Sequence, residues 1–272
     1  MAKGLYKNIL TRLPAALIIA AITFGMLFLQ SFFLACCFIG AIGLLLSYEW
    51  LQLSSCTVNL KQIIFCVTPF VLLTYFGQEF VYYFLALSLS FWFLYGCSLV
   101  SRNSYHIPSM SFNNNYLGIF LIQALVLGAI SILSFINFEY HSSYFVFFLL
   151  LFITALIDVA AYLVGSSMGK TPLFPELSPN KTLEGFLGAL LLTCLFLSLM
   201  HWLELISLKL FLLLLGVIPF AFIGDYLESQ LKRKQKVKDS GSLIPGHGGV
   251  WDRLDSHIAV IPVFAALCLL AT

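Results

Sequence analysis

Residues 142–168 read SSYFVFFLLLFITALIDVAAYLVGSSM, and this stretch decides the class of fold. Asp158 is its single charged residue. A helix needs about 20 predominantly apolar residues to cross the hydrocarbon core of a bilayer, and this stretch is long enough. A surface helix of a soluble protein would instead carry a polar face along its whole length. The stretch therefore predicts a membrane-spanning helix.

The composition of the whole chain leads to the same conclusion. Of the 272 residues, 61% are hydrophobic and 10% are charged, and the mean hydropathy is +0.99. Soluble domains carry about 25% charged residues, so this chain cannot cover itself with a polar surface. The seven cysteines form no CxxC pair and lie mostly in apolar runs, so neither a disulfide framework nor a zinc site is predicted.

We predict an all-α fold: a polytopic integral membrane bundle of about nine transmembrane helices. The chain divides into residues 1–140, with spans 1–5, and residues 141–272, with spans 6–9 and the polar loops. No loop is long enough to fold as a separate soluble domain. The nine predicted spans lie near residues 13–29, 31–51, 60–76, 79–101, 116–135, 142–168, 183–203, 208–230 and 254–271.

The distribution of Lys and Arg predicts the orientation of the chain in the membrane. With a cytoplasmic N-terminus and nine alternating spans, 13 of the 14 Lys and Arg residues fall on the cytoplasmic side, and only Lys209 falls outside. This bias is what the positive-inside rule describes. A missing or extra span would blur it, because every later loop would change sides.

Two carboxylates, Asp158 and Asp225, lie inside predicted spans. Burying a carboxylate at membrane depth costs at least about 2.5–3.5 kcal/mol, so each needs a cation, a metal or water as a partner. For both aspartates the alternative is a solvated helix end or a helix–helix hydrogen bond. Asp225, Ser229, Lys232 and Arg233 follow the spacing i, i+4, i+7, i+8, which places them on one stripe of a helix. A metal at Asp225 would then have phosphate-binding cations one to two turns away.

The segment after this stripe is the most polar of the chain. Its glycine-rich part, Pro245-Gly-His-Gly-Gly249, lets the backbone approach a ligand and point N–H groups at an anion. Asp252 can meet Asp225 across the folded-back loop and share a divalent ion, and hard oxygen ligands suit Mg²⁺. For Asp255, favourable placement at a helix N-terminus is a sufficient alternative. Five cations precede the loop: Lys232, Arg233, Lys234, Lys236 and Lys238.

A second polar stretch covers residues 165–185. Its first part resembles a P-loop, but it has one residue too few between its glycines and follows a membrane helix rather than a strand, so we reject that interpretation. Ser178 is expected to cap the following helix, with Glu184 in the first turns. Lys181 is either a solvated cation or a contact for phosphate or nucleotide.

The stretch Ser229-x-Leu-Lys-Arg-x4-Lys-Asp-x-Gly-x2-Ile-Pro-x-His-Gly-Gly-Val-x-Asp-Arg-Leu-Asp255 resembles the signature of the phosphatidate cytidylyltransferases, also called CDP-diacylglycerol synthases. We find no departure within these 27 positions. The blocks Asp158-x-Ala-Ala-Tyr and Ser-Pro-x-Lys-Thr-x-Glu-Gly185 are also similar to conserved blocks of this family. The resemblance covers residues 150–260 well, whereas the N-terminal half matches only in hydropathy.

The resemblance implies transfer of CMP from CTP to phosphatidate, giving CDP-diacylglycerol and pyrophosphate. It also implies a helical bundle in a bacterial-type plasma (inner) membrane, a cytoplasmic active site in residues 141–272, a homodimer and no nucleic-acid partner. Mg²⁺ is the expected cofactor, with two metal ions of which one is replaced by or paired with a monovalent cation. The family's two metal-binding aspartates match Asp225 and Asp252.

From these residues we expect the following roles. Lys232, Arg233 and Lys238 hold phosphate oxygens, and the turn of His247, Gly248 and Gly249 wraps them. The remaining expected substrate contacts are Lys181, Ser229, Asp239 and Arg253.

Three other functions fit part of the sequence. A lipid-alcohol kinase that uses CTP would release CDP instead of pyrophosphate. The second alternative is a transporter with Asp158 and Asp225 on its ion path, and the third is a scaffold whose basic loop binds anionic lipids. Neither explains why basic, glycine-rich and acidic residues follow one another in 229–255.

Overall fold

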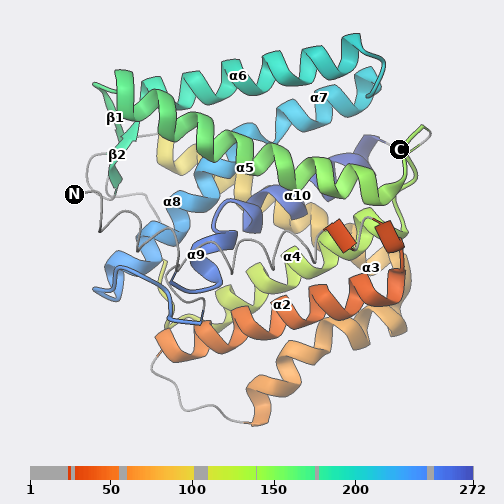
Figure 1. Ribbon diagram of the computed structural model, residues 1–272. Coiled ribbons are helices and arrows are strands. Elements are labelled where there is room, and N and C mark those ends of the chain that lie inside the picture. Colours follow the sequence, from red (N-terminus) through yellow and green to blue (C-terminus); the bar gives the residue numbers. More distant parts are fainter. Residues whose placement is uncertain are drawn as a thin grey trace.

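The structure is a computed structural model, and it describes residues 24–25, 28–54, 60–100, 110–138, 140–174, 178–243 and 248–271, with side chains apart from those of 60–76, 174 and 178–180. Its helices pack into one bundle (Figure 1). The elements in chain order are α2 (Phe32–Leu53), α3 (Leu60–Val100), α4 (Asn115–Ser134), α5 (Ser143–Met168), β1 (Pro172–Phe174), β2 (Ser178–Thr182), α6 (Leu183–Trp202), α7 (Leu208–Gly216), α8 (Ile218–Lys234), α9 (Trp251–Leu254) and α10 (His257–Ala271).

Within the described residues, six helices are long and apolar enough to cross a membrane. They are Phe32–Leu53, Gly77–Val100, Asn115–Ser134, Ser143–Met168, Leu183–Trp202 and Leu208–Lys234. The prediction of a polytopic helical membrane protein is thereby confirmed. The predicted span 13–29 lies almost wholly outside the described residues, and α10, at 15 residues, is shorter than the others. The count of nine spans stays a prediction.

The predicted boundary between spans 60–76 and 79–101 coincides with a break in α3. Gly77 has φ 68° and ψ −162°, which is non-helical backbone inside a segment of 41 residues. Glycine adopts positive φ readily because it has no Cβ. The predicted boundary between the two spans therefore falls at the glycine that interrupts the helix.

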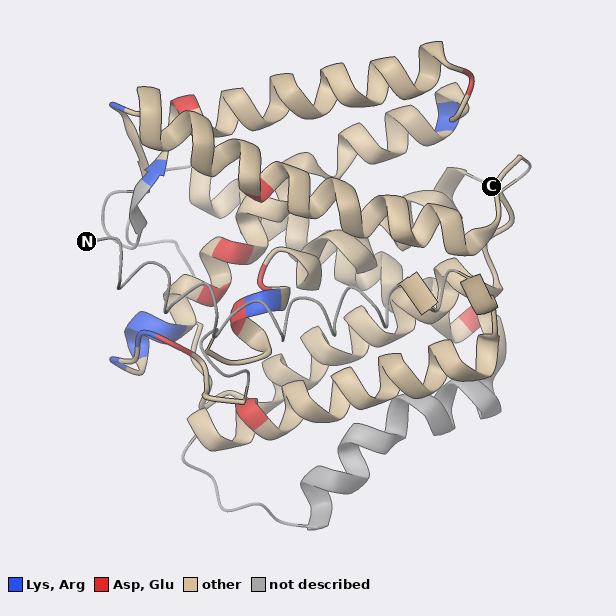
Figure 2. Cartoon of the chain, viewed as in Figure 1, with Lys and Arg blue, Asp and Glu red and all other residues tan. Residues whose placement is uncertain are grey.

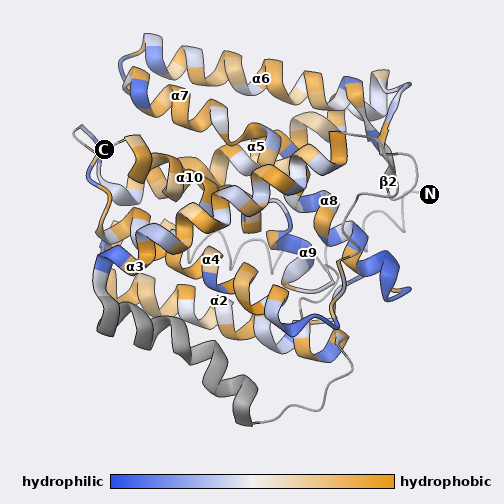
Figure 3. Ribbon diagram, turned by 180° about the vertical axis from the view of Figure 1, so that it is seen from behind, coloured by the Kyte–Doolittle hydropathy of each residue, from blue (hydrophilic) through white to orange (hydrophobic). Residues whose placement is uncertain are grey.

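α4 lies at the centre of the bundle, whereas α6 lies at its edge. In the most apolar stretch of 18 residues in each helix, 78% of the residues are buried in α4 but only 22% in α6. The outer helices turn many leucines and aromatic side chains outward, and Figure 3 shows hydrophobic residues along them. An apolar exterior of this extent is expected where the surrounding solvent is lipid.

A short antiparallel hairpin, β1–β2, departs from the all-α prediction. It joins α5 to α6 and pairs Pro172 with Thr182 and Phe174 with Ser178. The expected cap at Ser178 is wrong, because that residue lies in β2 and α6 begins only at Leu183. The cap is Thr182, as its side chain accepts a hydrogen bond from the third residue of α6.

Glu184 lies in the first turn of α6, as predicted, and it also ties the hairpin to the end of α5. Its carboxylate accepts hydrogen bonds from the backbone N–H groups of Lys170 and Thr171 at 3.1 Å each. The hairpin is thereby fixed at one end of the bundle, and it places Lys181 there.

Charged side chains are unevenly distributed over the described residues (Figure 2). Lys and Arg gather at the end of the bundle that carries the hairpin and the C-terminal end of α8. Lys209 lies at the opposite end, at the start of α7. This separation is the one that the charge pattern predicts for the two sides of a membrane.

Candidate active site

Close packing between α8 and the turn before α10 builds one wall of the site. A Cβ atom on Gly224 would lie 2.5 Å from the carbonyl oxygen of Asp255 and 3.1 Å from the Cβ of Ala259. Only glycine allows this approach without displacing backbone. The approach brings Asp225, the next residue of α8, beside the carboxylate of Asp255.

Gly224→Ala is therefore expected to destabilise the protein, because the added methyl group must push α8 away from the turn. Overpacking of this kind costs roughly 1–3 kcal/mol. The thermal unfolding midpoint of the detergent-purified protein measures the effect. Gly216→Ala is a matched control, since a Cβ there would meet Leu267 at an ordinary 3.6 Å. Equal midpoints for the two variants would contradict the close approach.

Three carboxylates converge at this wall. Asp225, Glu228 and Asp255 each offer an oxygen, and these atoms all lie within 4.8 Å of one another. Asp225 and Glu228 share a face of α8 because they are three residues apart. Asp158 of α5 lies beside the group and accepts a hydrogen bond from the hydroxyl of Ser256 at 3.1 Å. Such a set of hard oxygen donors fits a divalent cation such as Mg²⁺.

Two lysines contact these acids. Lys181, from β2, forms an ion pair with Asp225. Lys232, two turns after Asp225 on α8, lies between two carboxylates: its ammonium is 2.7 Å from Glu228 and 2.8 Å from Asp252. Helical spacing therefore places Asp225 and Lys232 on one side of α8, and the described ion pairs of Lys232 are with Glu228 of the same helix and Asp252 of α9.

Asp252 is held by the loop that precedes it. Its Oδ2 accepts hydrogen bonds from the N–H groups of Ser240 and Gly249 at 2.8 Å each, and from the Ser240 hydroxyl at 3.0 Å. Burial acts to raise the pKa of Asp252, but the hydrogen bond from Lys232 and those from the two N–H groups outweigh it and hold that pKa below its usual value. Gly248 has φ +84°, and a Cβ there would lie 2.6 Å from Oδ2, so glycine is required at this turn.

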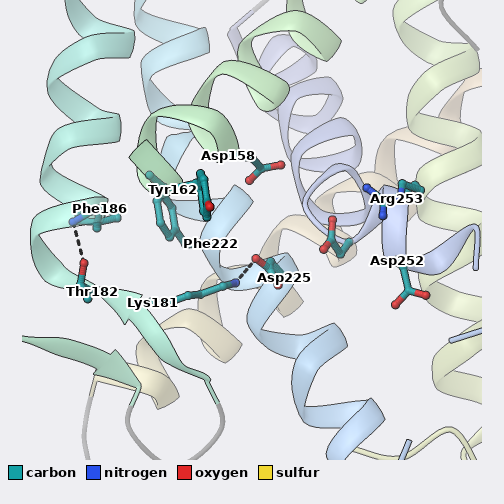
Figure 4. A pocket seen from close by; sticks show the side chains of 12 residues that line it. Asp158, Tyr162, Lys181, Thr182, Phe186, Phe222, Asp225, Asp252 and Arg253 are labelled. Atoms are coloured by element: carbon teal, nitrogen blue, oxygen red, sulfur yellow. Dashed lines mark hydrogen bonds and ion pairs between the residues drawn. The ribbon is translucent and has the colours of Figure 1, made fainter. Parts of the chain in front are cut away.

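A cavity of about 410 Å³ lies between α5, α6, α8 and α9, next to these groups. Figure 4 shows Asp158, Lys181, Asp225, Asp252 and Arg253 around it. Its lining also includes aromatic rings from three helices. These are Tyr162, Phe186 and Phe222. The cavity therefore joins a charged wall to an apolar one.

The structure brings some of the predicted site residues together and not others. Asp225, Asp252, Lys181 and Arg253 line the cavity, and Lys232 contacts Asp252. Gly248 and Gly249 lie against the Asp252 carboxylate. Ser229 is half-buried on α8 outside the cavity lining, and Arg233, Lys238 and Asp239 are exposed. His247 lies outside the described residues.

Sequence reasoning underestimated two acids and missed a third. Glu228, which helical spacing puts at the edge of the α8 stripe, belongs to the carboxylate cluster. Asp255 had a sufficient explanation in the helix dipole, although its position three residues after Asp252 was a signal. The third acid, Glu49 of α2, is buried and accepts hydrogen bonds from Val250 and Trp251. Its sequence neighbourhood gave no signal.

Fold and site together define a polytopic membrane protein with an acidic and basic cavity at one end of its bundle. The sequence profile described as the cytidylyltransferase family matches residues 10–271. The chain belongs to this family.

Several curated relatives are named phosphatidate cytidylyltransferase. The chain is 36% identical over 203 residues to the phosphatidate cytidylyltransferase of Aquifex aeolicus (strain VF5), which covers 74% of this chain and 71% of that protein. It is 49% identical over 109 residues to the phosphatidate cytidylyltransferase of Bacillus subtilis (strain 168), covering 39% of this chain and 40% of that one. It is 44% identical over 117 residues to the phosphatidate cytidylyltransferase of Staphylococcus haemolyticus (strain JCSC1435), and this alignment covers 42% of this chain and 45% of that protein. The chain thus spans less than half the length of these last two relatives.

Proposed function

We propose that this chain transfers CMP from CTP to phosphatidate and releases CDP-diacylglycerol and pyrophosphate, a reaction of phospholipid biosynthesis. The observation that carries the proposal is the cavity at the end of the bundle, which joins carboxylates and lysines to aromatic rings within a membrane protein of the cytidylyltransferase family. Acidic groups suit a metal-bound triphosphate, and the apolar wall suits the neighbourhood of acyl chains.

The chain's own residues would act mainly by placing two anions together. The phosphate of phosphatidate is already an oxyanion near neutral pH, so it needs little general-base assistance. Its oxygen attacks the α-phosphorus of CTP in line, a P–O bond forms, and pyrophosphate leaves as the bond to the β-phosphate oxygen breaks. In this proposal Lys181, Lys232 and Arg253 offset charge on the phosphates and the Gly248–Gly249 turn wraps them, while the Gly249 N–H stays bound to the Asp252 carboxylate. Positioning and electrostatic stabilisation then account for most of the catalysis.

The carboxylates have the donor chemistry to hold magnesium. Asp225, Glu228 and Asp255 would form the main set, with Asp252 and Asp158 next to it. When bound, Mg²⁺ supplies charge neutralisation and polarisation of phosphate oxygens. Sharing of an ion between Asp225 and Asp252, the presence of a second ion and the contribution of a monovalent cation are parts of this proposal.

The membrane arrangement is also proposed. Nine spans with a cytoplasmic N-terminus would place the basic end of the bundle in the cytoplasm, where CTP is found. A bacterial-type inner membrane and a homodimer follow from the resemblance to the family. The described charge separation between the two ends of the bundle supports this orientation.

The proposed reaction predicts strict dependence on both substrates and on a divalent cation. Detergent-purified protein given CTP, phosphatidate and Mg²⁺ is expected to produce CDP-diacylglycerol and pyrophosphate in equal amounts. A chelator should abolish the activity, and added Mg²⁺ should restore it. Chromatography of products from α-labelled CTP measures the lipid product, and a coupled assay measures pyrophosphate.

The products also separate this proposal from the alternatives. Release of CDP with a phosphorylated lipid alcohol, and no pyrophosphate, would replace the proposal with a kinase. Ion flux in liposomes without consumption of CTP would replace it with a transporter. Dialkyl phosphates without the glycerol backbone test how far the lipid phosphate alone is recognised.

A further inference from the structure

Glu49 is a buried acid far in sequence from the residues that line the cavity. It lies on α2, and none of its surface is exposed. Its Oε1 accepts a hydrogen bond from the N–H of Val250 at 2.8 Å, and its Oε2 accepts one from the N–H of Trp251 at 3.0 Å. The hydroxyl of Ser240 lies at 3.4 Å from Oε2. Burying a carboxylate in a protein is unfavourable unless hydrogen-bond donors surround it. These donors therefore account for the burial of Glu49.

Ser240 and Val250 belong to the loop between α8 and α9, which the structure describes at residues 235–243 and 248–250, and Trp251 is the first residue of α9. This α8–α9 loop packs its backbone directly against the Glu49 carboxylate. A Cβ on Gly241 would lie 2.8 Å from Oε1, and a Cβ on Gly249 would lie 2.6 Å from Oε2. Two glycines of the loop therefore leave the space that the carboxylate occupies.

α2 also contacts the side chain of Trp251. The indole N–H of Trp251 donates a hydrogen bond to the carbonyl oxygen of Leu46 at 2.8 Å, and its ring lies 5.2 Å from that of Trp50, centroid to centroid. Val250, the N-cap of α9, has no side-chain cap of its own. Glu49 supplies the missing acceptor from another helix, so the start of α9 is fixed by α2.

The part of the α8–α9 loop that contacts Glu49 also orients Asp252. Ser240 and Gly249, which touch Glu49, give Asp252 three of its hydrogen bonds. Asp252 follows directly after Trp251, which Glu49 binds. A shift of the α8–α9 loop away from Glu49 must therefore move the Asp252 carboxylate and the Gly248–Gly249 turn relative to α8.

We propose that Glu49 is a positioning residue of the active site. Its carboxylate fixes the α8–α9 loop and thereby aims Asp252 and the Gly248–Gly249 turn at the phosphates and their metal. This role rests on the function proposed above. It also gives the N-terminal half of the chain, which lies outside the motifs at residues 150–260, a part in the reaction.

Glu49→Gln tests the role with the shape of the side chain preserved. Glutamine can offer its single carbonyl oxygen to one N–H group, but its amide nitrogen then faces the other donor. Tyr48→Phe is the matched control, because Tyr48 is the preceding residue of α2, is exposed, and has as its described hydrogen-bond partner Gln52 on the same helix.

Two measurements decide the outcome. In metal-free protein, hydrogen exchange of the amides of Val250 and Trp251 is expected to quicken by about tenfold or more in Glu49→Gln, because hydrogen bonds to a charged acceptor are lost. In the enzyme assay, the Mg²⁺ concentration for half-maximal activity is expected to rise about tenfold or more, as for other losses of outer support around a metal ligand. The turnover rate should fall about 10²-fold. Tyr48→Phe should match the wild type in each.

Unchanged exchange at these amides would show that Glu49 does not hold the loop. Faster exchange with an unaltered Mg²⁺ dependence and rate would show a purely structural contact, and would also overturn the proposal. If Glu49→Gln does not yield folded protein, Ser240→Ala replaces it: this variant removes the hydroxyl between the two carboxylates, and the same shifts are expected in smaller size. A wild type without cytidylyltransferase activity would refute the proposed function and this role within it, while the exchange data would still decide whether Glu49 holds the loop.

Discussion

Asp225→Asn is expected to lower the rate of CDP-diacylglycerol formation by about 10³-fold at saturating CTP and phosphatidate, because metal-ion stabilisation of this kind contributes several kcal/mol. Asp225 belongs to both features of the site: its oxygen lies in the carboxylate cluster, and Lys181 forms its ion pair. The amide keeps the size of the side chain but removes the charge. The loss should appear in turnover as well as in the Mg²⁺ concentration required.

A matched control separates this effect from the general cost of removing an acid. Glu204→Gln changes an exposed carboxylate in the turn between α6 and α7, at the opposite end of the bundle. It should retain wild-type activity. Unfolding midpoints of both variants distinguish a loss of catalysis from a loss of folded protein. An Asp225→Asn protein that turns over at the wild-type rate would remove the metal role from this residue.

Lys232→Met is expected to damage both stability and activity. The Lys232 ammonium is shared by Glu228 and Asp252, whose side chains are 2% and 9% exposed. Removing one partner from a buried ionic group costs roughly 3–5 kcal/mol, because the remaining charge is left without compensation. The pKa of Asp252 should rise, since the hydrogen bond from Lys232 is the largest of the contributions that lower it. Activity should fall about 10²-fold, as when one donor to a reacting phosphate is lost.

The control for this change lies in the same basic segment. Lys236 is exposed, and the structure describes no ion pair for it, so Lys236→Gln should alter activity less than about twofold. Unfolding midpoints and steady-state rates measure both variants. A Lys232→Met protein with the midpoint of the wild type would contradict the buried ionic arrangement. A Lys232→Met rate equal to that of the Lys236→Gln protein would contradict the role of Lys232 in catalysis.

Hydropathy predicted the helices well because the requirement for long apolar runs is strong and local. The ends of most spans agree with the structure within a few residues, and Gly77 marked a real break. The hairpin was missed for a physical reason. Its strands are of three and five residues, and they are held by the Glu184 carboxylate and by the ends of α5 and α6 rather than by any strand-like pattern.

The site was predictable where one helix or one short segment presents its residues together. The stripe on α8 is an example, because helical spacing alone places Asp225 and Lys232 on one face. Glu49 is the opposite case. Its partners lie about 200 positions away, and a single acid in an apolar run gives no indication of which distant backbone it will bind. Asp255 is a similar case, because it joins the carboxylate cluster only through the close approach of its turn to Gly224.

The order in which the chain is made gives the turn before α10 a further importance. Asp158 and Asp225 are synthesised with earlier helices, whereas Ser256, whose hydroxyl binds Asp158, follows them in the chain. Until residue 256 has been made, Asp158 lacks this hydrogen-bond donor, and an uncompensated carboxylate at membrane depth is unfavourable. A nascent chain stalled before residue 250 should therefore be a preferred substrate for membrane quality-control proteases, whereas one completed through α10 should escape them.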